Sequence, residues 1–310
     1  MRQTAYSSRN KMLSNIFYLV NFSFSMFCSS LALIFAFLTI SIVVGNRDSR
    51  TISNVLVCNT AIAVMSFHII NLISIIYALI DDPSRSLFFC IFLGYCYAVF
   101  SAAICYSYSI QALSQLFFTV LYQYRILLTW KIHSLMIFFV WLISFTTMCP
   151  PIFYQGYRFE IESRLCIPTS KVFITSIYVV AIVFVIPLNI IFISYGTILY
   201  GVHRSTRRIS AFASNKFSKF RSRPFLNVKR EMKLMKNMFI LLLILISGGT
   251  PYLFIILWQI IQRSPVPESM YLLAINCVPI CISINMIVLF FMSDSMRKLF
   301  FQFLNYAQHR

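Results

Sequence analysis

The feature that most constrains this chain is the placement of its charged residues, which leaves seven long apolar stretches uninterrupted. None of the 34 Asp, Glu, Lys and Arg residues falls inside them. A bilayer core about 30 Å thick takes roughly 20 helical residues to cross, and a charge at its centre is costly. We therefore expect an all-α bundle of seven transmembrane helices, forming a single domain over residues 1–310. The stretches cover residues 25–44, 55–79, 87–122, 135–153, 172–199, 238–261 and 270–292.

Composition excludes a soluble fold. Hydrophobic residues make up 59% of the chain and charged residues only 11%, whereas soluble domains carry about 25% charged residues. A water-soluble domain of this size could not bury so many large apolar side chains. Soluble enzymes, nucleic-acid-binding proteins and disordered proteins are thereby excluded. The net charge of +18 would suggest nucleic-acid binding only in a polar chain.

The positive charges predict that the N-terminus lies outside. In that orientation 18 Lys and Arg residues fall in inner segments and 8 in outer segments, in agreement with the positive-inside rule. The Asn21 sequon is so close to the first stretch that we expect it to stay unmodified. The densest segment, residues 203–236, should bind anionic lipid at about 1 kcal/mol per charge. Its basic residues include Arg204, Arg207, Arg208, Lys229, Arg230, Lys233 and Lys236.

Two of the nine cysteines differ from the rest, most of which lie within apolar stretches. Cys90 lies at the outer end of the third stretch, and Cys166 lies in the loop between the fourth and fifth. Both would face the oxidising side of the membrane, where disulfides persist. We expect a disulfide that holds the loop 154–171 over the mouth of the bundle, with two unpaired thiols as the alternative.

Several residues, taken in their order along the chain, resemble those of the rhodopsin-like family of G-protein-coupled receptors. The resemblance covers nearly the whole chain. The resemblance implies a plasma-membrane receptor without a cofactor, which binds an extracellular peptide, lipid or small neutral molecule and signals to a heterotrimeric G protein. It also implies a short amphipathic helix at residues 293–303. The matching residues are the Cys90 and Cys166 pair, Trp141, Pro187 with Tyr195, Pro251 with Tyr252, and Asn285.

The family's switch motifs are degenerate here. Gln115 replaces the arginine that usually ends the third helix, within Ser114-Gln115-Leu116, and Val64 replaces the usual aspartate of the second helix. Because glutamine has no full charge, any inactive-state lock should be weaker, which implies either raised basal activity or impaired coupling. An inert hydrogen bond from Gln115 to a neighbouring helix is the alternative. The switch and coupling candidates are Ser114, Gln115, Tyr195, Pro251 and Asn285.

A ligand pocket is expected between the outer halves of the third, fifth, sixth and seventh helices. The spans carry no charge, so a protonated amine would meet only dipoles and aromatic faces there. Tyrosine and tryptophan near helix ends also form interfacial belts, which is the competing interpretation. The pocket candidates are Tyr97, Ser101, Tyr252, Gln259, Tyr271 and Asn276.

Two other function classes were weighed against a receptor. An enzyme is not expected, because the spans contain no acid, no metal-ligand cluster and no catalytic Ser/His/Asp set. A metal site is not expected for the same reason. Ion and proton pathways generally leave ionisable residues within the membrane. A transporter or channel for a neutral solute or lipid is therefore the alternative that stays open.

Overall fold

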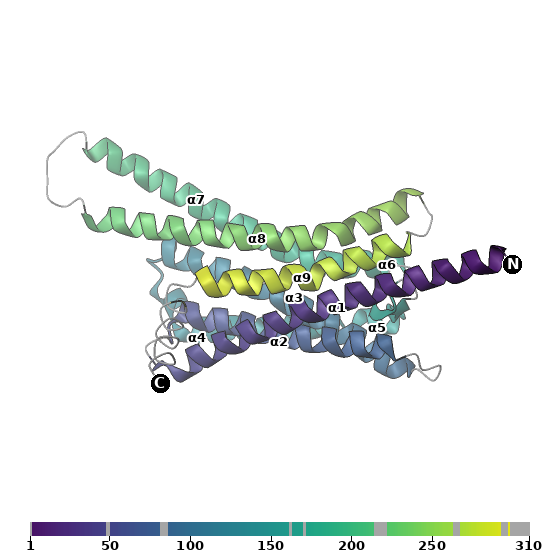
Figure 1. The fold of residues 1–310 in the computed structure, drawn as a ribbon. Coiled ribbons are helices and arrows are strands. Elements are labelled where there is room, and N and C mark those ends of the chain that lie inside the picture. Colours follow the sequence, from purple (N-terminus) through teal and green to yellow (C-terminus); the bar gives the residue numbers. More distant parts are fainter. Residues whose placement is uncertain are drawn as a thin grey trace.

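The computed structural model describes residues 2–47, 50–80, 86–160, 163–169, 172–213, 222–262 and 267–292, together with Arg297. Within these residues, seven helical segments are long and apolar enough to cross a membrane. They lie side by side in one all-α bundle (Figure 1). We call the end where α1 begins the outer end, and the end where α7 finishes and α8 begins the inner end.

The helix boundaries differ from the predicted stretches mainly at the ends. The first helix begins well before residue 25, the third ends at Thr119 rather than near residue 122, and the fourth begins at Trp130. Asn21 lies inside the first helix, where its side-chain amide donates to the Phe17 carbonyl over 2.8 Å. The helices are α1 (Arg2–Gly45), α2 (Ile52–Leu79), α3 (Leu87–Thr119), α4 (Trp130–Thr147), α5 (Pro150–Phe153), α6 (Phe173–Val180), α7 (Ile186–Ala213), α8 (Ser222–Gln262) and α9 (Glu268–Met292).

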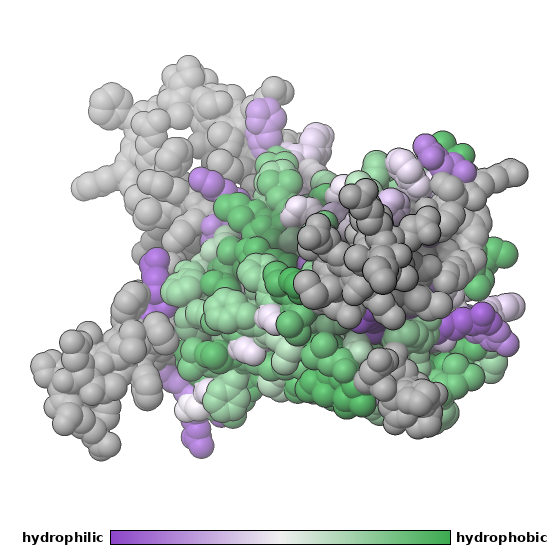
Figure 2. All heavy atoms as spheres, turned by 45° about the vertical axis from the view of Figure 1, so that its right-hand side comes forward, coloured by the Kyte–Doolittle hydropathy of each residue, from purple (hydrophilic) through white to green (hydrophobic). Residues whose placement is uncertain are grey.

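The bundle exposes apolar side chains and buries polar ones, as expected of a protein solvated by lipid. Phe37, Phe138 and Ile193 are each at least 60% exposed, whereas Ser29 and His68 are completely buried. Apolar residues cover much of the visible side of the molecule in Figure 2. In hydrocarbon, helices gain little from burying more apolar surface, so packing and interhelical hydrogen bonds hold them together.

Two helices are shaped by proline. The fifth membrane segment consists of α6, a π-helical turn at Ala181–Val185 and α7. Pro187 is the second residue after this turn and has no N–H to donate, so the regular hydrogen-bond ladder is interrupted there. Ser109 of α3 donates to the Pro187 carbonyl over 3.1 Å. In α8, Pro251 follows Gly248 and Gly249, a combination that favours bending.

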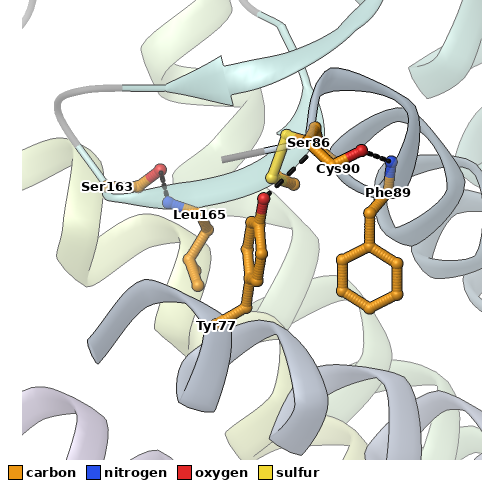
Figure 3. The surroundings of a disulfide bond; sticks show 7 residues. Tyr77, Ser86, Phe89, Cys90, Ser163 and Leu165 are labelled. Atoms are coloured by element: carbon orange, nitrogen blue, oxygen red, sulfur yellow. Dashed lines mark hydrogen bonds between the residues drawn. A yellow bond between two sulfur atoms is a disulfide. The ribbon is translucent and has the colours of Figure 1, made fainter. Parts of the chain in front are cut away.

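A short hairpin covers the outer end of the bundle. Strand β1 (Tyr157–Glu160) pairs with β2 (Leu165–Pro168) in antiparallel register, with Phe159 opposite Cys166. A disulfide joins Cys90 to Cys166, as predicted. Figure 3 shows the bond beside the N-terminus of α3, where the Ser86 hydroxyl accepts a hydrogen bond from the Phe89 N–H and caps the helix.

Two predicted features lie outside the described residues. The amphipathic helix expected at 293–303 is one of them, since only Arg297 of that segment is described. The other is the middle of the basic loop, residues 214–221. The rest of that loop continues the helices of the bundle, because α7 runs to Ala213 and α8 begins at Ser222.

Candidate functional site

A cavity of about 130 Å³ lies in the outer half of the bundle. Its wall comes from α3, from α6 with the following π turn, and from α8 and α9, while β2 supplies Ile167 and Pro168. The wall is almost entirely apolar. The lining residues are Tyr97, Ala98, Ser101, Ile104, Cys105, Ile167, Pro168, Val179, Val180, Val183, Phe184, Leu245, Gly248, Gly249, Tyr252, Leu253, Ile275, Val278, Cys281 and Ile282.

Three of the six predicted pocket residues line this cavity, namely Tyr97, Ser101 and Tyr252. The Ser101 hydroxyl donates to the Tyr97 carbonyl over 2.8 Å. The Tyr97 ring packs against Phe67 of α2 with 4.8 Å between ring centroids. Tyr97 of α3 and Tyr252 of α8 both pack against the apolar cluster that contains Ile167. The polar groups of the cavity therefore gather where α3 faces α8.

The other three candidates, Gln259, Tyr271 and Asn276, lie outside the lining of this cavity. On α9, Ile275, Val278 and Ile282 face the cavity, so the adjacent Asn276 is turned about 100° away around the helix. Tyr271 is buried in an apolar cluster that borders the cavity, with residues of α1 and β2. Gln259 lies about two turns further along α8 than Tyr252 and is half-buried.

The cavity also contains residues that sequence reasoning missed. A Cβ added to Gly248 would lie 2.7 Å from the Cys281 Cβ, and one added to Gly249 would lie 2.6 Å from the Phe184 ring. Both glycines thus let α8 approach α9 and the π turn closely at the cavity wall. A Gly-Gly pair inside an apolar helix was the available signal, since such a pair often marks a close approach.

The hairpin forms the outer boundary of the cavity. Every residue of β2 is buried, and Leu165 and Ile167 pack with Ile75 of α2, Ile255 of α8 and Leu272 of α9. Glu160, at the end of β1, is 1% exposed and accepts a hydrogen bond from the Thr169 hydroxyl. Thr169 directly follows Pro168 of the cavity wall, so the Glu160 carboxylate lies close behind that wall.

Tyr157 of β1 fills the space above Gly94, where a Cβ on the glycine would lie 3.2 Å from the Tyr157 Cβ. The room left by Gly94 is therefore taken by the hairpin. The Tyr157 hydroxyl donates to the Met148 carbonyl over 2.9 Å. Burial raises the pKa of this hydroxyl above its ordinary value, so it stays a neutral donor. The hairpin is thus held by both a covalent bond and a buried hydrogen bond.

Polar side chains link the helices around the cavity. Asn59 of α2 accepts from the Trp141 indole over 2.9 Å and donates to Ser107 over 2.8 Å, which ties α2 to α4 and α3. A second group joins α1, α2 and α9. There His68 contacts Ser29 at 3.1 Å and Ser283 at 3.4 Å. These contacts fix the arrangement of helices that shapes the cavity.

The switch candidates are spread over the inner half. Ser114 pairs with His133 of α4 at 2.9 Å. The Gln115 side-chain oxygen is buried without a hydrogen-bond partner. Both side-chain polar atoms of Asn285 are likewise buried and unpartnered. Tyr195 faces Met238 and Leu242 of α8 across a smaller cavity, and Pro251 lies next to Tyr252 in α8.

Helix α8 packs unevenly against its neighbours. Its backbone lies close to that of α9, but along the seam with α6, the π turn and α7 the backbones are farther apart, and contact is made by side chains such as Phe184 and Ile191. The 130 Å³ cavity lies along this seam, and so does the smaller one beside Tyr195.

Comparison with known proteins agrees with this architecture. The family model described as "7 transmembrane receptor (rhodopsin family)" matches residues 35–288. The chain belongs to the rhodopsin family of receptors. Membership makes it a multi-pass membrane protein of a family that signals through G proteins and whose members are receptors rather than enzymes. A search of curated protein sequences finds no match.

The fold of this rhodopsin-family chain is also that of a solved receptor. The crystal structure of squid rhodopsin superposes with a TM-score of 0.77, covering 94% of this chain and 86% of that one, at 18% sequence identity. At such low identity the likeness shows the fold alone. The cavity, whose lining differs residue by residue within such a fold, must be interpreted from its own side chains.

Proposed function

We propose that this chain is a plasma-membrane receptor that binds an extracellular ligand, whether peptide, lipid or small neutral molecule, and signals to a heterotrimeric G protein. The observation that carries the proposal is the position of the cavity on the seam between α8 and the π turn. An occupant touches the π turn on one side and α8 on the other. Binding would therefore favour one position of α8 over another.

The inner end offers the surface on which such a change would act. Helices α7 and α8 extend past the rest of the bundle on the side where α1 and α9 end (Figure 1). These extensions carry Arg204, Arg207 and Arg208 on α7 and Lys229, Arg230, Lys233 and Lys236 on α8. The cationic segments suit both a G-protein partner and anionic lipid.

The degenerate switch residues determine the activity of the receptor without a ligand. With Gln115 in place of arginine, no ion pair can hold the inner end of α3, and the buried Gln115 oxygen lacks even a neutral partner. This favours a bundle whose inner end opens easily. Raised ligand-free activity is the expected outcome.

Guanine-nucleotide exchange in membranes that contain the chain and a panel of G proteins tests this proposal. The wild type is compared with Gln115→Arg and with Gln123→Arg, which adds the same charge in the exposed turn after α3. We expect ligand-free exchange above empty membranes for the wild type and for Gln123→Arg, and lower exchange for Gln115→Arg. Activity in Gln115→Arg alone would mean that ordinary coupling has been lost. Silence of all three would contradict the proposal, and vesicle flux of neutral solutes would then test the transporter alternative.

A further inference from the structure

The cavity wall restricts the chemistry of anything that binds there. Among its lining residues there is no charged side chain, and the polar groups are the hydroxyls of Tyr97, Ser101 and Tyr252 and the thiols of Cys105 and Cys281. An ion entering such a site would lose its hydration without gaining a counter-charge, which is strongly unfavourable. The wall therefore selects against cations and anions alike.

Glu160 is the one described acid close to this cavity, and it would be the counter-charge of an amine. It is not among the lining residues, and Ile167 and Pro168 of the paired strand form the outer wall. Its carboxylate already accepts the Thr169 hydroxyl, which leaves the cavity wall itself neutral. An amine is thus disfavoured, and Glu160→Gln becomes a direct test of this alternative.

The volume limits the size of the occupant. The cavity measures about 130 Å³, close to an engineered apolar protein cavity of about 150 Å³ that stays dry and binds benzene. Beyond Ile167, β2 packs with α2, α8 and α9 and fills the outer mouth of the bundle. A peptide chain would have to displace this packing, and a whole lipid exceeds the volume.

The hydroxyls give the site a polar end. The Ser101 hydroxyl donates to the backbone of its own helix, so towards a ligand it can act as an acceptor. Tyr97 and Tyr252 line the cavity from α3 and α8, and both pack against the cluster that contains Ile167. Val183, Phe184 and the Gly248-Gly249 pair form the apolar remainder. A ligand with one hydrogen-bonding group and an apolar body would place that group against the hydroxyls and its body against the apolar wall.

From these observations we propose that the ligand of this cavity is a small, uncharged and mostly apolar molecule, of about one ring in size, with a single hydrogen-bonding group that meets the tyrosine hydroxyls. The inference rests on the proposed receptor function, because it assigns a ligand class to that receptor's site. Its test nevertheless uses binding alone, so that it can fail or succeed separately from signalling.

The test measures the thermal unfolding midpoint of the purified chain in lipid nanodiscs, against increasing probe concentration. The probes share one carbon skeleton and are acetophenone, which is neutral, and 1-phenylethylamine, which is protonated at pH 7. Val183→Phe fills the cavity from the π turn. Val185→Phe is the matched control, because Val185 belongs to the same turn but is 45% exposed on the outside of the bundle. Val278→Phe fills the cavity from α9 should Val183→Phe misfold.

We expect acetophenone to raise the midpoint of the wild type and of Val185→Phe, since a ligand that binds the folded state stabilises it. Val183→Phe should weaken the apparent affinity about tenfold or more, because an overfilled apolar pocket loses at least that much. The ammonium probe should have no such effect. Equal behaviour of the two phenylalanine variants, or no stabilisation by acetophenone, would overturn the inference.

Preference for the ammonium probe, lost in Glu160→Gln, would overturn it as well and would identify a cation site. The nucleotide-exchange assay is run on the same preparations. Binding of acetophenone that depends on Val183, without any exchange, would support the ligand class and count against the receptor function. Exchange driven by the ammonium probe alone would support the receptor function and count against the ligand class.

Discussion

At the scale of single residues, the bundle shows two buried asparagines with opposite environments. Asn59 bridges Trp141 and Ser107 through both of its amide atoms. Asn285 is 1% exposed and neither of its side-chain polar atoms has a partner. In hydrocarbon, a hydrogen bond between helices stabilises the fold modestly. A buried polar group without a partner carries the full desolvation penalty. The same substitution should therefore have opposite signs at these two positions.

Asn59→Leu should lower the free energy of unfolding by about 1–2 kcal/mol, because two interhelical hydrogen bonds are lost. Thermal unfolding in detergent micelles measures the change. Ser66→Ala is the control, since Ser66 is less buried and its hydroxyl bonds only to the Ile62 carbonyl of its own helix. A loss of equal size in both variants would show that the bridge to Trp141 and Ser107 contributes nothing specific.

Asn285→Leu should raise the free energy of unfolding by about 1 kcal/mol, since it removes an unsatisfied buried amide. The same unfolding assay applies, with Asn59→Leu as the comparison of opposite sign. Destabilisation would contradict the expectation and would indicate that bound water satisfies the amide.

At the scale of elements, the hairpin packs against α3 through one close contact. Tyr157 of β1 packs directly over Gly94, while the disulfide from Cys90 to Cys166 fixes β2 to the same helix. Since β2 carries Ile167 and Pro168 into the cavity wall, the fit between Gly94 and Tyr157 indirectly sets the outer wall of the ligand site.

Gly94→Val should destabilise the protein by about 1–3 kcal/mol, because added atoms must displace Tyr157 and the hairpin. It should also speed reduction of the Cys90–Cys166 bond by dithiothreitol, which reports on the hairpin alone. Gly196→Val is the matched control, since nothing lies within 4 Å of a Cβ at that position. Unchanged reduction rates in Gly94→Val would contradict the assigned packing.

At the scale of the whole molecule, the two ends of the bundle differ in charge. The segments that the positive-inside rule places inside hold 18 of the 26 Lys and Arg residues, and the extensions of α7 and α8 hold many of these. The disulfide-bonded hairpin lies at the other end, which suits an oxidising compartment. Both features predict the same orientation, with the N-terminus outside.

An epitope fused before Met1 should bind antibody on intact cells, and one fused after Arg310 should bind only after permeabilisation. Immunofluorescence of cells that express each fusion measures this, with the reversed staining as the contradicting result. Surface staining by the first fusion would also test the proposed plasma-membrane location.

The sequence by itself determined the bundle. Each membrane-spanning helix can be recognised in the sequence because the bilayer excludes charged residues over about 20 positions. The pairing of Cys90 with Cys166 was predictable because these two cysteines, unlike most of the others, were placed at the outer end of a span and in an outer loop, on the oxidising side. The order of Trp141, Pro187, Pro251 and Asn285 was sufficient to predict the receptor family.

Only the tertiary structure decided which face of each helix forms the site. In a soluble helix the apolar stripe reveals the buried face, but here lipid and core are both apolar, so the signal disappears. Tyr271 and Asn276 were therefore indistinguishable in sequence from Tyr97 and Tyr252, although only the latter pair lines the cavity. Gly248, Gly249 and the residues of β2 gained their roles from neighbours distant in the chain, because a close approach exists only once the helices have packed.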